Sequence, residues 1–175
     1  MTIRKKFYPW ASALPRKLAV DIATLFGLGE LKAPGTWGSA AGALFYAFIF
    51  SGVGSNTVWG VAQYLLLASF GAYLAVGICD AAERALGMRD PHKINLDEFV
   101  AMNFCFIPVC SSGYSVYGLF LGFALFRFFD ILKPLGINSL QSLEGGLGCV
   151  ADDIAAAVLS CACLNFLAVF LPSIY

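Results

Sequence analysis

No charged residue interrupts the segment Thr57-Val-Trp-Gly-Val-Ala-Gln-Tyr-Leu-Leu-Leu-Ala-Ser-Phe-Gly-Ala-Tyr-Leu-Ala-Val-Gly-Ile-Cys79. Its length matches the roughly 20 mostly apolar residues that a helix needs to cross a bilayer. The whole chain shares this character, because 59% of its 175 residues are hydrophobic and only 13% are charged. Soluble domains carry about 25% charged residues, and one of this size has too small an interior for so much apolar surface. We therefore predict an all-α, polytopic membrane helical bundle.

Three long blocks of the chain contain no charged residue: Ala33–Cys79, Phe99–Phe126 and Ile154–Tyr175. Turn-forming sequences divide the first two blocks, at residues 51–57 and 110–113. The five spans that we predict are Thr36–Phe50, Thr57–Cys79, Ile94–Val109, Tyr114–Leu132 and Val150–Leu171.

The N-terminal segment carries a modest amphipathic stretch, Leu14–Leu28, which we expect to lie in the membrane interface. No apolar run separates the basic residues 4–6 from the small residues 11–13, so we expect no cleaved signal peptide. We predict an N-terminal cytoplasmic or interfacial segment over residues 1–32 and a single transmembrane catalytic domain over residues 33–175.

Every lysine and arginine falls on one side of this five-span topology. The positive-inside rule makes that side cytoplasmic. The same topology collects residues 34–36, 80–98, 127–133 and 145–153 on one membrane face. A net charge of zero argues against a nucleic-acid partner, which normally requires a basic excess.

Two acidic pairs, Asp97-Glu98 and Asp152-Asp153, directly precede apolar runs. Acidic residues at a helix start also have a structural explanation, because they stabilise the positive end of the helix dipole. Ionisable groups at membrane depth are costly, however, and usually pair or bind something. Two pairs on one face favour a binding site.

Arg127 and Asp130 are three residues apart, which places them on one helix face. They form either a structural ion pair or, with Lys133, a ligand set for phosphate or carboxylate. Pro134 is expected to end this helix. The glycine-rich start of the first span suits an anion, with Thr36 as a candidate ligand or, alternatively, a helix cap.

Other polar residues have simpler interpretations. Asp90 and His92 share a loop, where a catalytic role for the chain's single histidine is possible but not favoured. Asp80, Glu83 and Arg84 are expected to form a solvated helix end. The six cysteines lack a C-x-x-C pair, and we interpret them as small buried hydrophobic residues rather than disulfides or a zinc site.

Carboxylates without histidine or cysteine ligands suit a hard cation, with Mg²⁺ first. The candidate acidic residues are Asp90, Asp97, Glu98, Asp130, Asp152 and Asp153. Mg²⁺ commonly pairs with substrate phosphate, which the two nearby cations Arg127 and Lys133 would also bind. A site at the membrane boundary suits a lipid with a phosphorylated headgroup.

Four blocks of this sequence, in order, resemble those of the phosphatidylglycerophosphatase A family. The blocks are Pro34-Gly-Thr-Trp-Gly-Ser39, Asp97-Glu-Phe-Val100, Phe126-Arg-Phe-Phe-Asp-Ile-Leu-Lys-Pro134, and Gly145-Gly-Leu-Gly148 followed by Asp152-Asp-Ile154. The resemblance implies a bacterial inner-membrane enzyme that is Mg²⁺-dependent and converts phosphatidylglycerophosphate into phosphatidylglycerol and phosphate. It covers residues 27–165. Residues 92–95 and Glu144 depart from the family pattern.

By motif, the resemblance implies the acidic site residues Asp97, Glu98, Asp130, Asp152 and Asp153 and the basic residues Arg127 and Lys133. We expect metal-assisted hydrolysis in which Arg127 neutralises charge on the phosphoryl oxygens. Both direct attack by water and an aspartyl-phosphate intermediate fit these residues.

Two other functions compete with this hypothesis. The first is a Mg²⁺-dependent phosphotransferase of the CDP-alcohol type, whose Asp-Gly…Ala-Arg…Gly…Asp…Asp spacing this chain lacks. The second is a non-enzymatic carrier or channel, which predicts polar groups on both membrane faces rather than on one.

Overall fold

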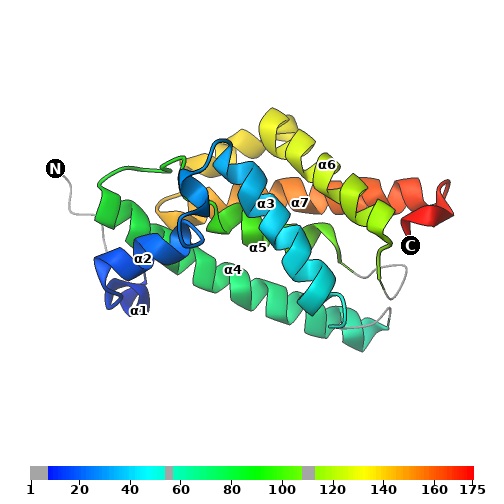
Figure 1. Ribbon diagram of the computed structural model, residues 1–175, viewed down its shortest axis with the longest axis horizontal. Helices are drawn as coiled ribbons and strands as arrows, with labels where there is room; N and C mark the ends of the chain where they lie inside the picture. Colours follow the sequence, from blue (N-terminus) through cyan, green and yellow to red (C-terminus); the bar gives the residue numbers. More distant parts are fainter. Residues whose placement is uncertain (1–7, 54–56, 108–112) are drawn as a thin grey trace.

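The computed structural model describes residues 8–53, 57–107 and 113–175, and these ranges contain helices and no strand (Figure 1). The α-helices are α1 (Pro9–Ser12), α2 (Arg16–Ala23), α3 (Pro34–Phe45), α4 (Val58–Leu86), α5 (Leu96–Cys105), α6 (Val116–Leu132) and α7 (Gly146–Ala168). Short 3₁₀ turns are η1 (Leu28–Glu30), η3 (Pro134–Ser142) and η4 (Pro172–Ile174), and the π-helical turn η2 (Tyr46–Phe50) continues α3. The all-α fold class is confirmed.

The short helix α5 lies at the centre of the bundle and contacts α3, α4, α6 and α7. Eight of its ten residues are buried. Small residues let α3 approach it closely: a Cβ added at Gly38 would lie 2.6 Å from the Asn95 carbonyl oxygen. Because α5 touches four helices, its first turn lies where their ends converge.

Two helices, α4 and α7, are long and apolar enough to cross a membrane. They have 29 and 23 residues, whereas α3, α5 and α6 have 12, 10 and 17. A span needs about 20 apolar residues. The prediction of about five spans is therefore not confirmed, although each predicted span contains a helix. The predicted end of the third span, Val109, lies outside the described residues.

Helix boundaries follow local signals in the sequence. The Thr57 hydroxyl accepts the Gly60 N–H at the start of α4, and the Ser115 hydroxyl accepts the Gly118 N–H at the start of α6. Lys133 adopts a left-handed conformation (φ +43°) and precedes Pro134, so α6 ends where the sequence predicts.

The start of α7 differs from the prediction. The helix begins at Gly146 rather than Val150, so Asp152 and Asp153 lie in its second turn. The effect of a helix dipole falls off within the first turn. The dipole explanation therefore applies to Asp97-Glu98, which lie in the first turn of α5, but not to Asp152-Asp153.

The predicted amphipathic stretch Leu14–Leu28 contains a shorter helix, α2, which packs on α4 and buries Ala19 and Ala23. The helix stops early because Leu25 and Phe26 have positive φ angles of +46° and +55°. Such angles do not continue a right-handed helix.

The expectation of a solvated end for α4 is wrong. Asp80 and Glu83 are 3% and 2% exposed. They are buried because α7 packs on this part of α4 and each carboxylate has a partner. An Asp80 oxygen lies 2.8 Å from an Arg84 guanidinium nitrogen, and Glu83 accepts the backbone N–H of Asp90 at 2.8 Å.

Candidate active site

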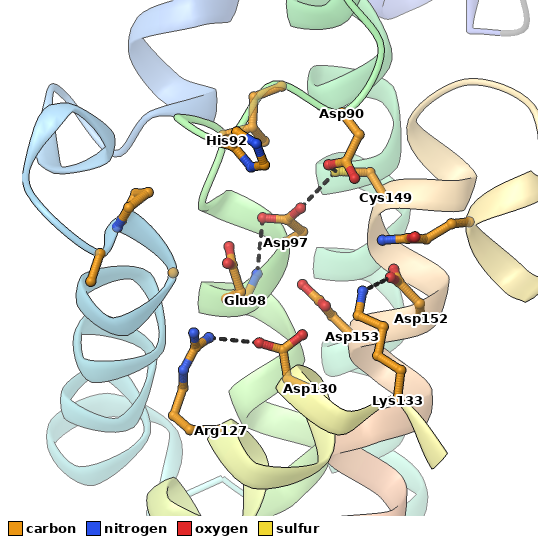
Figure 2. Close-up of a pocket in the computed structure, with 15 residues that line it drawn as sticks. Asp90, His92, Asp97, Glu98, Arg127, Asp130, Lys133, Cys149, Asp152 and Asp153 are labelled. Atoms are coloured by element: carbon orange, nitrogen blue, oxygen red, sulfur yellow. Dashed lines mark hydrogen bonds and ion pairs between the residues drawn. The ribbon is translucent and has the colours of Figure 1, made fainter. Parts of the chain in front are cut away.

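A cavity of about 480 Å³ opens where the starts of α3, α5 and α7 meet the end of α6 and the loop before α5 (Figure 2). Its titratable lining residues are Asp90, His92, Asp97, Glu98, Arg127, Asp130, Lys133, Cys149, Asp152 and Asp153. Segments of the chain that are distant in the sequence therefore contribute to one site. The structure thus brings residues from each of the predicted polar blocks together in one cavity, although Thr36 does not line it.

Asp97, Glu98 and Asp153 form a cluster in this cavity, and none of the three has an ion-pair partner among the residues that the structure describes. Asp97 and Asp153 are only 5% and 4% exposed. One oxygen from each of the three residues lies within 4.8 Å of the others. This arrangement is costly without a cation, because buried like charges repel one another and have lost their hydration.

Glu98 illustrates this crowding, because one of its carboxyl oxygens lies within 4.8 Å of oxygens from Asp97 and Asp153. The Glu98 Oε2 atom is buried without a hydrogen-bond partner among the described residues. The neighbouring Asp97 accepts the backbone N–H of Glu98 through Oδ1 at 3.1 Å, and this bond orients the Asp97 side chain at the start of α5.

Arg127 reaches the cavity from the last turns of α6. Its Nη1 atom lies 2.7 Å from Asp130 Oδ2 and donates to the Ser39 hydroxyl at 3.3 Å. Ser39, which is fully buried, in turn donates to the Gly35 carbonyl at 2.6 Å. A Cβ at Gly35 would lie 2.3 Å from Glu98 Oε1 and 3.0 Å from Arg127 Nη1, so a larger residue here would displace these two side chains.

Lys133 enters the cavity from the turn after α6, where its left-handed backbone ends the helix. Its ammonium group donates to Asp152 Oδ2 on α7. Burial lowers the pKa of Lys133, but the ion pair with Asp152 outweighs burial and the pKa is raised overall. Lys133 is therefore a cation at neutral pH.

The cavity therefore combines two cations, each held by a carboxylate, with three carboxylates that lack a cation. Carboxylate oxygens in a group of this kind suit a divalent metal, and Arg and Lys suit phosphate. Comparison with known proteins points the same way. The sequence profile of the phosphatidylglycerophosphatase A family matches residues 21–168.

This chain belongs to the phosphatidylglycerophosphatase A family. The chain is accordingly a phosphatase, and the resemblance seen in the sequence is confirmed. The phosphatidylglycerophosphatase A of Haemophilus influenzae is 34% identical over 139 residues, which cover 78% of this chain and 80% of that protein. The protein of the same name from Escherichia coli K12 is 29% identical over 148 residues, covering 83% of this chain and 81% of that protein.

A third relative of the chain has a different name. A Bacteroides thetaiotaomicron protein called "Putative phosphatidylinositol-3-phosphatase" is 33% identical over 148 residues, covering 83% of this chain and 91% of that protein. No solved structure matches the chain significantly.

Seven of the eight site residues predicted from the sequence line the cavity: Asp97, Glu98, Arg127, Asp130, Lys133, Asp152 and Asp153. Asp130 and Asp152, which the sequence groups with the metal ligands, are ion-paired with Arg127 and Lys133. Thr36 is exposed on the first turn of α3 and does not line the cavity, although its neighbour Gly35 does.

Sequence reasoning missed Cys149, Ser39 and Glu83. Cys149 is a buried core residue, as predicted, but it also lines the cavity and donates to Asp97 Oδ2 at 2.6 Å. The described cysteines form no disulfide, while Cys110 lies outside the described residues. One sequence feature could have indicated that Cys149 lies at the site. It precedes Asp152 by three residues on the same helix, which places both on one helix face.

Proposed function

We propose that the chain hydrolyses the terminal phosphate of phosphatidylglycerophosphate, giving phosphatidylglycerol and phosphate, in a Mg²⁺-dependent reaction of phospholipid biosynthesis. One observation carries the proposal. A single cavity contains a cluster of three carboxylates that have no ion pair, together with an arginine and a lysine that are each paired with another carboxylate. A phosphate monoester needs both kinds of group, one for a metal and one for its own oxygens.

The residues fit a hard divalent cation. The Asp153 carboxylate is buried and has no hydrogen bond or ion pair with any other residue in the described ranges, and one Glu98 oxygen is buried without a partner. These oxygens and those of Asp97 are the donors that Mg²⁺ prefers. A cation held there would polarise the phosphoryl group and neutralise its negative charge.

Arg127 and Lys133 are assigned to the phosphate oxygens. Each side chain is oriented by a carboxylate, Asp130 for Arg127 and Asp152 for Lys133, and Ser39 supports Arg127 from α3. The guanidinium fork offers several donors to charge that grows on the equatorial oxygens during transfer. Orienting carboxylates reduce the entropy lost when the substrate binds.

A membrane position supports a lipid substrate. The helices α4 and α7 are long and apolar enough to span a bilayer. The cavity is lined by residues from the first turns of α7, whose start lies against Asp80 near the C-terminal end of α4. We place this end at the cytoplasmic face of the bacterial inner membrane, because the chain's lysines and arginines gather on that side of the predicted topology. The acyl chains would then remain in the lipid while the headgroup enters the cavity.

A second candidate substrate is phosphatidylinositol 3-phosphate, which the name of the Bacteroides thetaiotaomicron relative suggests. Both lipids carry a phosphate monoester on a headgroup, and the same residues would hold either phosphate. The two headgroups differ in size, so the cavity should favour one of them. The rates of phosphate release from the two lipids therefore show which is the better substrate.

The test is phosphate release by the purified protein in mixed micelles of each lipid, with chelator and after Mg²⁺ is restored. We expect rapid release from phosphatidylglycerophosphate, slower release from phosphatidylinositol 3-phosphate, and loss of both with chelator. Full activity in chelator would contradict the metal assignment. Release of CMP from a CDP-alcohol lipid, without release of phosphate, would instead support the phosphotransferase.

A further inference from the structure

Two segments outside the α-helices form one side of the cavity. The loop between α4 and α5, residues 87–95, contributes Asp90 and His92, and η3 contributes Gln141. Asp90 and His92 are exposed and Gln141 is half-buried, so solvent reaches this side of the cavity. The proposed hydrolysis gives none of these three side chains a task. The contacts that hold the two segments together nevertheless shape the space that a headgroup enters.

Arg89 joins one of these segments to the other. Its Nη2 atom donates to the backbone carbonyl oxygens of Gln141 and Leu143, the latter at 3.0 Å. Hydrogen bonds from a charged donor are roughly twice as strong as neutral ones. No described carboxylate forms an ion pair with Arg89, and the residue is exposed and does not line the cavity. Its contacts therefore act on the two segments rather than on a substrate.

The two carbonyl groups that receive Arg89 lie against α7. A Cβ added at Gly148 would lie 2.6 Å from the Leu143 oxygen and 2.9 Å from the Gln141 oxygen, so both oxygens approach the backbone of α7 closely. The Leu143 N–H also donates to the Leu140 carbonyl at 3.0 Å. Arg89 thus reaches a point where three parts of the chain meet: the loop before α5, the end of η3 and the start of α7.

The loop has a second anchor next to Arg89. The backbone N–H of Asp90 donates to the buried Glu83 on α4 at 2.8 Å. Asp90 has a φ angle of +46°, a left-handed conformation that is unfavourable for a residue with a side chain. Such a conformation persists only where the surrounding contacts hold it. Glu83 and Arg89 supply these contacts from two different parts of the structure.

We propose that Arg89 is a positioning residue for the phosphatase reaction, which holds this side of the cavity at the width that a lipid headgroup needs. Because η3 begins directly after Lys133, fixing the end of η3 also stabilises the turn that carries this phosphate-binding cation. Without Arg89 the two segments would separate and the headgroup would bind less tightly. The identity of the substrate rests on the proposed function, whereas the joining of the segments does not.

The first test is the kinetics of phosphate release from phosphatidylglycerophosphate in mixed micelles with saturating Mg²⁺. Arg89→Ala should raise KM about tenfold, the factor expected for loss of one charged hydrogen bond, and change kcat less than about twofold. The Mg²⁺ concentration for half-maximal activity should stay the same. Arg89→Lys keeps a cationic donor and should recover most of the lost affinity. Arg16→Ala, an exposed arginine on α2 outside the cavity, is the matched control and should leave KM unchanged.

A second measurement reads the contact itself and needs no substrate. Amide hydrogen exchange of the full-length protein in detergent, followed by mass spectrometry, reports how often each segment opens. In Arg89→Ala, exchange should become faster in residues 87–95 and 134–145 and stay unchanged in the central helix α5. Unchanged exchange in α5 also shows that the variant is folded.

Four results overturn the proposal: an unchanged KM in Arg89→Ala, a loss in kcat as large as the change in KM, no recovery in Arg89→Lys, or exchange that is unchanged in both segments. Faster exchange throughout the chain, α5 included, would also overturn it, because Arg89 would then contribute only to global stability. If the unmodified protein releases no phosphate from this lipid, the proposed function fails, and the exchange measurement still decides whether Arg89 joins the two segments.

Discussion

The two sets of carboxylates in the cavity differ in what neutralises them. Asp130 and Asp152 each face a cation of the same chain, Arg127 and Lys133. Asp97, Glu98 and Asp153 lie close to one another and, within the described residues, form no ion pair with a lysine or arginine. Buried charges are costly unless they are paired, so the second set could be neutralised by an added ion, whereas the first is already paired in the folded chain. We therefore propose different tasks for carboxylates that look alike in the sequence.

The strongest challenge to this comparison is Asp153→Asn. This substitution removes a negative charge from the carboxylates proposed to bind Mg²⁺. It should lower the rate of phosphate release about 10³-fold, equivalent to roughly 4 kcal/mol of transition-state stabilisation. Asp97→Asn should behave in the same way. Asp21→Asn, on α2 and outside the cavity, is the matched control and should keep its activity. A near-normal rate in purified, folded Asp153→Asn would refute the site assignment.

The next largest effect should come from Arg127→Lys. The substitution keeps the charge but loses the planar fork, so we expect kcat to fall about 10²-fold. The affinity for Mg²⁺, measured by calorimetry, should change little. Arg127 forms its ion pair with Asp130 and its hydrogen bond with Ser39, and not with the carboxylates proposed to bind the metal. Equal losses of metal affinity and kcat would place Arg127 in the metal site instead.

Asp152→Asn probes the set that is already paired. If Asp152 mainly orients Lys133, its loss should reduce kcat/KM about 10- to 100-fold, the range seen for residues that support a ligand. The effect should appear mostly in KM, and the concentration of Mg²⁺ that gives half-maximal activity should stay the same. A marked rise in that concentration would show that Asp152 binds the metal, as the sequence analysis expected.

The smallest effect concerns stability. Asp97, Glu98 and Asp153 repel one another when no cation lies between them. The melting temperature should therefore be lower in chelator than with Mg²⁺. Glu98→Gln removes one of the three charges and should narrow this difference. An identical difference in Glu98→Gln would exclude Glu98 as its cause.

Much of the fold could be predicted from patterns along the chain. Charge-free blocks located a helix in each predicted span, and Pro134 marked the end of α6, because these signals act over a few residues. The number of spans could not be confirmed, because α5 is only ten residues long and is buried by four neighbouring helices rather than by its own length. The buried state of Asp80 and Glu83 likewise depended on contacts with α7 and the Asp90 loop.

The sequence by itself determined the helical, apolar character of this phosphatase and seven of the residues that line its cavity, because hydrophobic periodicity and motif spacing are properties of the chain. Only the tertiary structure decided which carboxylate meets which cation. The partners Lys133 and Asp152 are separated by α7's start and the η3 turn, and Cys149 reaches Asp97 from another helix. Pairing depends on distances of a few ångströms between helices, which no local pattern encodes.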